Sequence, residues 1–225
     1  LLTGGYKNYR KWVLNQFEAD LPIRLIGGKT GTRKTDLLNY INNENIFVID
    51  LEGLANHRGS SFGGLGLPKQ PTSEQYENLI AEELNKYEKV PRKAIWLEAE
   101  SAHLGRCRIP TDLYKQMKEA PVLEINRTKK ERIYNLVGVY SVHKKEELEH
   151  ATSRISRRLG PQRTHEALQA IEREQWSKAC SAMLDYYDRC YEHELAKSPQ
   201  RKTIDISGLT SDQAAAKLIG EGLIQ

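Results

Sequence analysis

The sequence predicts an α/β protein whose mostly parallel sheet is covered by helices on both faces. Short apolar runs alternate along the chain with segments of helical periodicity, a pattern typical of parallel sheets. A glycine-rich turn follows the first apolar run and leads directly into a helical segment. The chain has 225 residues, 39% hydrophobic and 28% charged, which is enough apolar material for a core. No apolar run reaches the roughly 18 residues that a membrane span needs, so we expect no membrane partner.

Five apolar runs are predicted to form strands, and helical spacing of apolar residues marks the segments between them. Residues 51–71 are rich in glycine and polar side chains and are predicted to form a long loop of the kind that is usually functional or mobile. The predicted strands are 23–26, 46–50, 94–98, 121–125 and 202–206. The predicted helices are 6–17, 35–41, 73–89, 110–117, a largely helical stretch over 131–197 broken at Gly160-Pro161, and 213–219.

The order of these segments indicates a core with a helical insertion. We expect residues 21–133 and 198–225 to form the α/β core, and 134–197 to form a helical subdomain inserted before the last strand. The first residue is not Met, so we expect the chain to be cut from a longer protein. The cysteines are widely spaced without a CxxC pair, which favours reduced thiols in the cytoplasm over a disulfide framework or a metal site.

The glycine-rich turn matches the phosphate-binding P-loop pattern GxxxxGK[ST] at every defined position but one. In such a loop, backbone N–H groups surround phosphate oxygens at the start of a helix. Lys34 would place its ammonium on the terminal phosphates, and the Thr35 hydroxyl would bind Mg²⁺. The exception is Arg33, which replaces a glycine that permits unusual backbone dihedrals. We therefore predict a P-loop NTPase-like fold with the phosphate site Gly28, Lys29, Thr30, Gly31, Thr32, Arg33, Lys34 and Thr35.

A P-loop site also needs a carboxylate at the end of another strand, to hold Mg²⁺ or its water. The candidates are Asp50, Glu98 and Glu100. Asp50 ends the second predicted strand, a place that often faces the acceptor substrate in small-molecule kinases. Glu98 ends the third predicted strand and suits the metal role better, so Thr35 and Glu98 are the predicted Mg²⁺ ligands.

The stretch that follows the second strand, Asp50 to Gly66, is dense in Gly, Ser, Asn, His and Arg. It closely resembles the P-loop domain of the tRNA 2-selenouridine synthases. Further matches follow in order, among them Trp96-Leu97-Glu98-Ala99-Glu100-Ser101, Gly105-Arg106, Ile109-Pro110 and Glu131-Arg132. The resemblance covers Gly4 to Arg132 well and the helical remainder loosely. The residues of the expected substrate loop are Asp50, Glu52, Asn56, His57, Arg58, Ser60 and Ser61.

The resemblance implies a role in tRNA wobble modification. That family replaces the sulfur of 2-thiouridine with selenium from selenophosphate, through an S-geranyl intermediate made from geranyl diphosphate. The P-loop would then hold a diphosphate leaving group, whose departure the added charge of Arg33 would help. The expected co-substrates are geranyl diphosphate and selenophosphate, with Mg²⁺ as a further ligand and the use of ATP left open. The expected partners are tRNA, a selenophosphate-producing enzyme and a rhodanese-like domain, whose last strand and helix residues 1–20 resemble.

Cations near the loop supply the candidates for catalysis. The predicted catalytic residues are Lys34, Arg58, Arg127 and Glu98. Arg58 and Arg127 would complement the charge that develops on the leaving group. Arg127 also opens a basic run, a position that often forms a lid over phosphates in P-loop transferases.

A second basic cluster surrounds the Gly160-Pro161 break. Arg154, Arg157 and Arg158 fall on one helix face at i, i+3 and i+4, and Arg163 follows the break. We predict that these arginines bind tRNA phosphates, in keeping with the net charge of +4. The tyrosines at 186, 187 and 191 have helical spacing and are expected to pack rather than to stack on bases.

Two other functions fit parts of the pattern. A small-molecule kinase or ATPase would use the P-loop, the loop after Asp50 and a basic lid. A non-catalytic tRNA-binding module would tolerate a degenerate P-loop, which Arg33 suggests. ATP-dependent phosphoryl transfer without tRNA would identify the kinase or ATPase. Binding of tRNA that is unchanged by Lys34→Ala would identify the non-catalytic module.

Overall fold

The computed structural model describes residues 3–44, 46–89, 94–195, 198 and 200–225. Parts of two predicted segments therefore lie outside the described residues: Leu1 and Leu2 of the tail, and 196–197 at the end of the helical stretch. No helix in the described part is long and apolar enough to cross a membrane.

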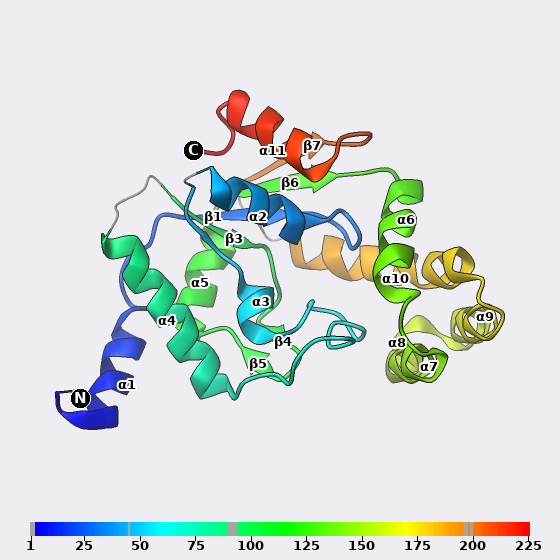
Figure 1. Ribbon diagram of the computed structural model, residues 1–225, viewed down its shortest axis with the longest axis horizontal. Coiled ribbons are helices and arrows are strands. Elements are labelled where there is room, and N and C mark those ends of the chain that lie inside the picture. The colour runs from blue at the N-terminus through cyan, green and yellow to red at the C-terminus, as the bar shows by residue number, and fades with distance from the viewer. Residues whose placement is uncertain (1–2, 45, 90–93, 196–197, 199) are drawn as a thin grey trace.

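In the described part of the chain, five parallel strands form the predicted sheet in the order β2-β3-β1-β6-β7. All their carboxyl ends therefore lie at the same edge, which faces the helices α6 and α10 (Figure 1). The predicted α/β fold with a mostly parallel sheet is confirmed. The strands are β1 (Ile23–Gly27), β2 (Val48–Ile49), β3 (Ile95–Glu98), β6 (Val122–Asn126) and β7 (Arg201–Asp205).

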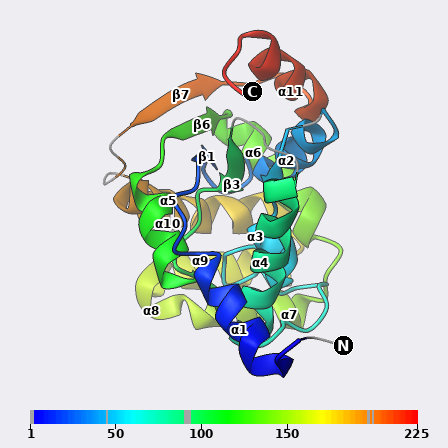
Figure 2. The same ribbon diagram turned by 90° about the vertical axis from the view of Figure 1, so that its left-hand side faces the viewer.

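Apolar residues fill both faces of the central strands because helices cover the sheet on both sides. In β1, Leu25 belongs to one apolar cluster and the adjacent Ile26 to the other, as expected for side chains that alternate across a strand. Figure 2 shows α2 (Lys34–Asn43) and α11 (Ser211–Gly220) together on one side of the sheet. The apolar cluster that contains Leu25 lies on the other side of the sheet. Its helices are α1 (Gly5–Asn15), α3 (Leu51–Ala55), α4 (Ser73–Lys89) and α5 (Thr111–Glu119).

The remaining helices form a third apolar cluster with Phe62, beside the carboxyl edge of the sheet. The predicted break is confirmed: Gly160 has φ 90°, and Pro161 begins the next helix. The boundaries 134–197 of a subdomain stay a prediction. The helices of this region are α6 (Lys129–Tyr140), α7 (Lys145–Arg154), α8 (Ser156–Leu159), α9 (Pro161–Glu172) and α10 (Trp176–Leu195).

Two short features were not predicted. The expected loop over 51–71 begins with α3, which Asp50 caps by accepting a hydrogen bond from the Gly53 N–H at 2.8 Å. An antiparallel pair, β4 (His103–Leu104) and β5 (Cys107–Arg108), follows β3. Both features are shorter than the window over which hydrophobic periodicity can be recognised.

Candidate active site

The P-loop opens into a cavity of about 1,100 Å³ at the carboxyl edge of the sheet. Residues that follow β1, β2 and β3 form one wall, because parallel strands deliver their carboxyl ends to the same place. Residues of α6, α10 and the segment 154–158 also line the cavity. From the predicted phosphate site, the lining residues are Gly28, Thr30, Gly31, Arg33, Lys34 and Thr35.

The loop has the geometry of a phosphate cradle around Lys34. The Lys34 ammonium donates to the carbonyl oxygen of Gly28 at 3.0 Å, which places it inside the loop. Gly31 has φ 86°, and a Cβ there would lie 2.7 Å from the Arg132 carbonyl oxygen. A side chain at position 31 would therefore push the loop away from α6.

Arg33 occupies the position where the pattern has glycine, and it adopts the conformation that favours glycine. Its φ is 65° and its ψ 45°, which costs an L-residue about 1–2 kcal/mol. The side chain is half exposed, lines the cavity and forms an ion pair with Asp36. The mismatch therefore adds a cation at the rim without abolishing the backbone turn.

Lys29 and Thr32 support the loop instead of facing the cavity. The Lys29 ammonium lies 3.0 Å from a carboxylate oxygen of Glu192 in α10. Thr32 is buried, and its hydroxyl donates to the Lys29 carbonyl oxygen at 2.8 Å. Neither residue lines the cavity, and their part in phosphate binding stays a prediction.

Three carboxyl groups meet beside Thr35. Ligand oxygens of Glu52, Glu98 and Glu100 all lie within 4.8 Å of one another. The Thr35 hydroxyl oxygen is 2.7 Å from Glu98 Oε1 and 3.2 Å from Glu52 Oε2. Burial, followed by repulsion from its neighbours, raises the pKa of Glu98 and of Glu52 well above the ordinary carboxyl range.

This cluster fits Mg²⁺. Glu98 is fully buried, and its Oε2 has no hydrogen-bond partner among the described residues. A divalent cation would satisfy that oxygen and remove the repulsion between the carboxylates. Carboxylate and hydroxyl oxygens beside a phosphate loop are the ligands that Mg²⁺ uses. Glu52, which we expected to contact substrate, thus joins Thr35 and Glu98 as a candidate ligand, as does Glu100.

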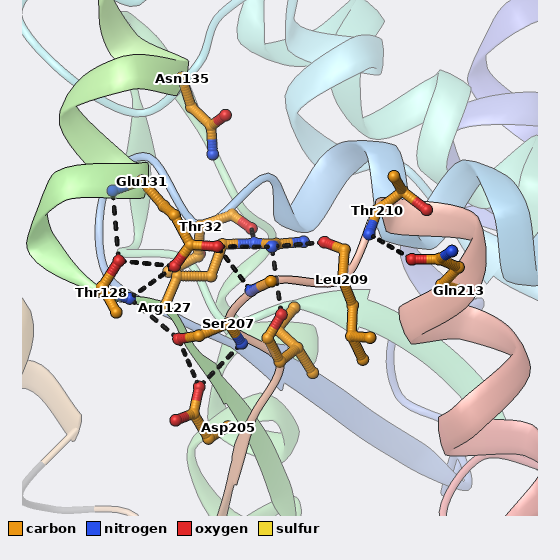
Figure 3. Close-up of polar contacts among 12 residues, drawn as sticks. Thr32, Arg127, Thr128, Glu131, Asn135, Asp205, Ser207, Leu209, Thr210 and Gln213 are labelled. Atoms are coloured by element: carbon orange, nitrogen blue, oxygen red, sulfur yellow. Dashed lines mark hydrogen bonds and ion pairs between the residues drawn. The ribbon is translucent and has the colours of Figure 1, made fainter.

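Arg127 does not form a lid. It is 6% exposed, and its guanidinium donates to the carbonyl oxygens of Thr32 at 3.1 Å, Ile206 at 3.2 Å and Leu209 at 2.6 Å (Figure 3). It does not line the cavity. The guanidinium is committed to three carbonyl groups and ties the P-loop to the segment after β7, so these contacts do not support the predicted catalytic role of Arg127.

The helix that follows is fixed at the same place. Thr128 caps α6 in a capping box with Glu131. The Glu131 carboxylate also accepts a hydrogen bond from the Gly208 N–H at 2.6 Å (Figure 3). The start of α6 is thereby joined to the segment after β7 as well as to the P-loop.

Arg132 and Asn135 of α6 hold two further carbonyl groups of the loop. The Arg132 Nε donates to the Thr30 carbonyl oxygen at 2.8 Å, and Asn135 Nδ2 donates to that of Gly31 at 2.9 Å. The rest of the Arg132 guanidinium pairs with Asp188 in α10. The Thr30 C=O and the Gly31 N–H belong to the same trans peptide group and point in opposite directions. Because the C=O points toward Arg132 in α6, the N–H of Gly31 points away from α6.

Most of the predicted substrate loop reaches the cavity. Arg58 donates to the Leu65 carbonyl oxygen at 3.0 Å, which fixes its guanidinium in the wall. His57 does not line the cavity, and burial lowers its pKa, so it is neutral at physiological pH. The members that do line the cavity are Asp50, Glu52, Asn56, Arg58, Ser60 and Ser61.

Three of the four arginines predicted to bind tRNA line the same cavity as the P-loop. Arg154, Arg157 and Arg158 line it, and Arg154 donates to the Ser61 carbonyl oxygen. Arg163 lies in a separate surface depression with Lys178. The first three therefore share a cavity with the P-loop, and the binding of tRNA by all four stays a prediction.

Sequence reasoning missed the aromatic part of the wall. Tyr186, Tyr187 and Tyr191 line the cavity beside Cys190, although we expected them to pack in the subdomain. All three tyrosines are at least partly buried, so they pack against their neighbours and also line the cavity. Their spacing on a helix does not distinguish a core from the wall of a site.

The chain matches known proteins over most of its length. A family model described as the tRNA 2-selenouridine synthase AAA domain matches residues 21–216. A tRNA 2-selenouridine synthase from Marinobacter nauticus is 32% identical over 231 residues, covering 88% of this chain and 61% of the relative. Another from Sulfurovum sp. is 31% identical, covering 89% of this chain and 62% of the relative. The chain thus spans less than two thirds of the length of these relatives. It belongs to the tRNA 2-selenouridine synthase family.

Proposed function

We propose that this chain supplies the part of a tRNA 2-selenouridine synthase that binds geranyl diphosphate and tRNA. In this reaction 2-thiouridine is converted to 2-selenouridine through S-geranyl-2-thiouridine. The observation that carries the proposal is one cavity lined by the P-loop, by Glu52 and Glu100 of the acidic cluster and by three arginines. Its volume of about 1,100 Å³ leaves room for a diphosphate together with a nucleoside.

The first step is an alkyl transfer. The sulfur of 2-thiouridine attacks the first carbon of the geranyl chain, a C–S bond forms, and the C–O bond to the diphosphate breaks. The bonding electrons leave with the diphosphate, and the base releases its N3 proton. The protein therefore has to stabilise the negative charge that accumulates on the leaving oxygens.

The residues around the loop are suited to that task. Lys34 and the loop N–H groups would hold the diphosphate, while Arg58 would complement its charge from the substrate loop. Mg²⁺, when bound by Thr35 and the acidic cluster, would neutralise further phosphate charge. Arg154, Arg157 and Arg158 would attract tRNA phosphates near the cavity.

We expect the selenium step to need a rhodanese-like domain, in the same full-length chain or in a separate protein. Selenophosphate from a partner enzyme would supply the selenium, and the wobble base of a cytoplasmic tRNA would receive it. We expect the geranylation step to need only the residues described here.

Mass spectrometry of tRNA nucleosides tests the proposal. The chain is incubated with geranyl diphosphate and 2-thiouridine tRNA, and the digested RNA is analysed for S-geranyl-2-thiouridine. We expect this product without ATP and no 2-selenouridine after selenophosphate is added. ATP-dependent phosphoryl transfer in the absence of tRNA would instead identify a kinase or ATPase. Binding of tRNA with no product would favour a non-catalytic module.

A further inference from the structure

A second, apolar cavity adjoins the P-loop cavity. It is partly open, measures about 60 Å³, and lies between α6, α9 and α10. Leu136 of α6, Ile171 of α9 and Met183 of α10 are among its walls, with Trp176 and Ala179. The lining is almost entirely apolar, so bound water would find few hydrogen-bond partners there.

The two cavities share part of their walls. Thr30, Ser60, Leu136, Tyr140 and Tyr187 line both. Thr30 belongs to the P-loop, so the apolar space begins next to the phosphate cradle. A ligand with a phosphate head in the loop could therefore place an apolar end in the second cavity without exposing it to water.

We propose that this apolar cavity receives the far end of the hydrocarbon chain of the diphosphate substrate and limits the length of that chain. The inference rests on the proposed function, because it assumes a prenyl diphosphate in the P-loop. A cavity of about 60 Å³ has room for roughly four to six water molecules. The first five-carbon isoprene unit would lie where the two cavities share their walls, and the apolar cavity has space for one further unit. The geometry therefore favours a hydrocarbon chain of ten carbons over one of fifteen.

Three positions on α10 control the depth of the cavity. Trp176, Ala179 and Met183 are spaced by three and four residues, so they lie on the same face of the helix. Ala179 is buried, and a leucine there would occupy space in the cavity. Met183→Ala would remove side-chain volume from the wall and lengthen the space. Ala182 does not line this cavity; it lines the separate surface depression that contains Arg163 and Lys178. Ala182→Leu is therefore the matched control for Ala179→Leu.

The test compares the affinities of inorganic diphosphate and of the dimethylallyl, geranyl and farnesyl diphosphates. In the unaltered chain we expect geranyl diphosphate to bind at least about tenfold tighter than the dimethylallyl compound, since about five more carbons are buried. Ala179→Leu should remove about tenfold of that preference and leave inorganic diphosphate unchanged. Met183→Ala should shift the preference toward farnesyl diphosphate, and Ala182→Leu should leave all four affinities as they are.

Tryptophan fluorescence gives a second measurement that needs no cavity variant. Trp176 lines the cavity, so geranyl diphosphate should change its emission while inorganic diphosphate should not. Trp176→Phe should abolish the change. Suppose that inorganic diphosphate binds, that affinity depends neither on chain length nor on Ala179→Leu, and that Trp176 emission does not respond to geranyl diphosphate. The cavity inference is then wrong and the P-loop proposal stands. If no diphosphate binds, both are wrong.

Discussion

Replacing Arg132 with alanine is expected to lower the free energy of unfolding by about 3 kcal/mol, because it breaks a buried ion pair. The Arg132 side chain is 4% exposed, and its partner Asp188 is 22% exposed. The substitution also removes the donor to the Thr30 carbonyl group in the P-loop. We therefore expect a less stable protein that also binds diphosphate more weakly.

Urea unfolding at equilibrium measures the first effect, and Lys129→Ala is the matched control. Lys129 pairs with Asp185 between the same two helices at 2.7 Å, but both side chains are about half exposed. Exposed pairs contribute at most about 1 kcal/mol. Equal losses in the two variants would contradict the view that burial makes the Arg132 contact important.

Glu98→Gln is expected to lower the affinity for Mg²⁺ by about 100-fold, the loss that follows removal even of an outer partner of a metal ligand. The amide keeps the size of the side chain and can still accept from the Thr35 hydroxyl. It cannot supply the negative charge that the cation needs. Because burial raises the pKa of Glu98 to about 8, protons compete with the cation, so the wild-type affinity should already fall as the pH is lowered through about 8.

Calorimetric titration with Mg²⁺ gives the affinities, and Asp50→Asn is the control. Asp50 lines the same cavity, but its carboxylate caps α3 and does not belong to the acidic cluster. Asn caps helices about as well as Asp, so we expect this variant to keep its stability to within about 0.5 kcal/mol and to bind Mg²⁺ within a few-fold of the wild type. Mg²⁺ binding that depends on Asp50 and not on Glu98 would move the metal site to the end of β2.

Much of the fold could be predicted because its longer elements have clear periodicity. Helix α4 has the predicted bounds 73–89, and each of the five predicted strands exists within a few residues. The sequence did not reveal α3 or the β4–β5 pair, because two to five residues carry no recognisable period. Their positions follow from local contacts such as the Asp50 cap.

The site could be predicted where a motif fixes the geometry. The P-loop pattern places Lys34 and Thr35 at the end of β1, and a parallel neighbour brings Glu98 beside them. The position of Arg127 could not be predicted, because a basic run in a sequence does not reveal which of its cations are buried. The direction in which Arg157 and Arg158 point was also not predictable, since it depends on how α8 packs against α9 and α10.

The central claim is that the P-loop, acting through Lys34, holds the diphosphate that leaves during geranyl transfer. The direct test is the rate of S-geranyl-2-thiouridine formation by Lys34→Ala compared with Lys29→Ala. Lys34 lies inside the loop, whereas Lys29 pairs with Glu192 outside the cavity. We expect Lys34→Ala to lower the rate by about 100- to 1,000-fold, the effect of losing one donor to a developing anion, and Lys29→Ala to lower it much less. Geranyl transfer by Lys34→Ala at the wild-type rate would contradict the account.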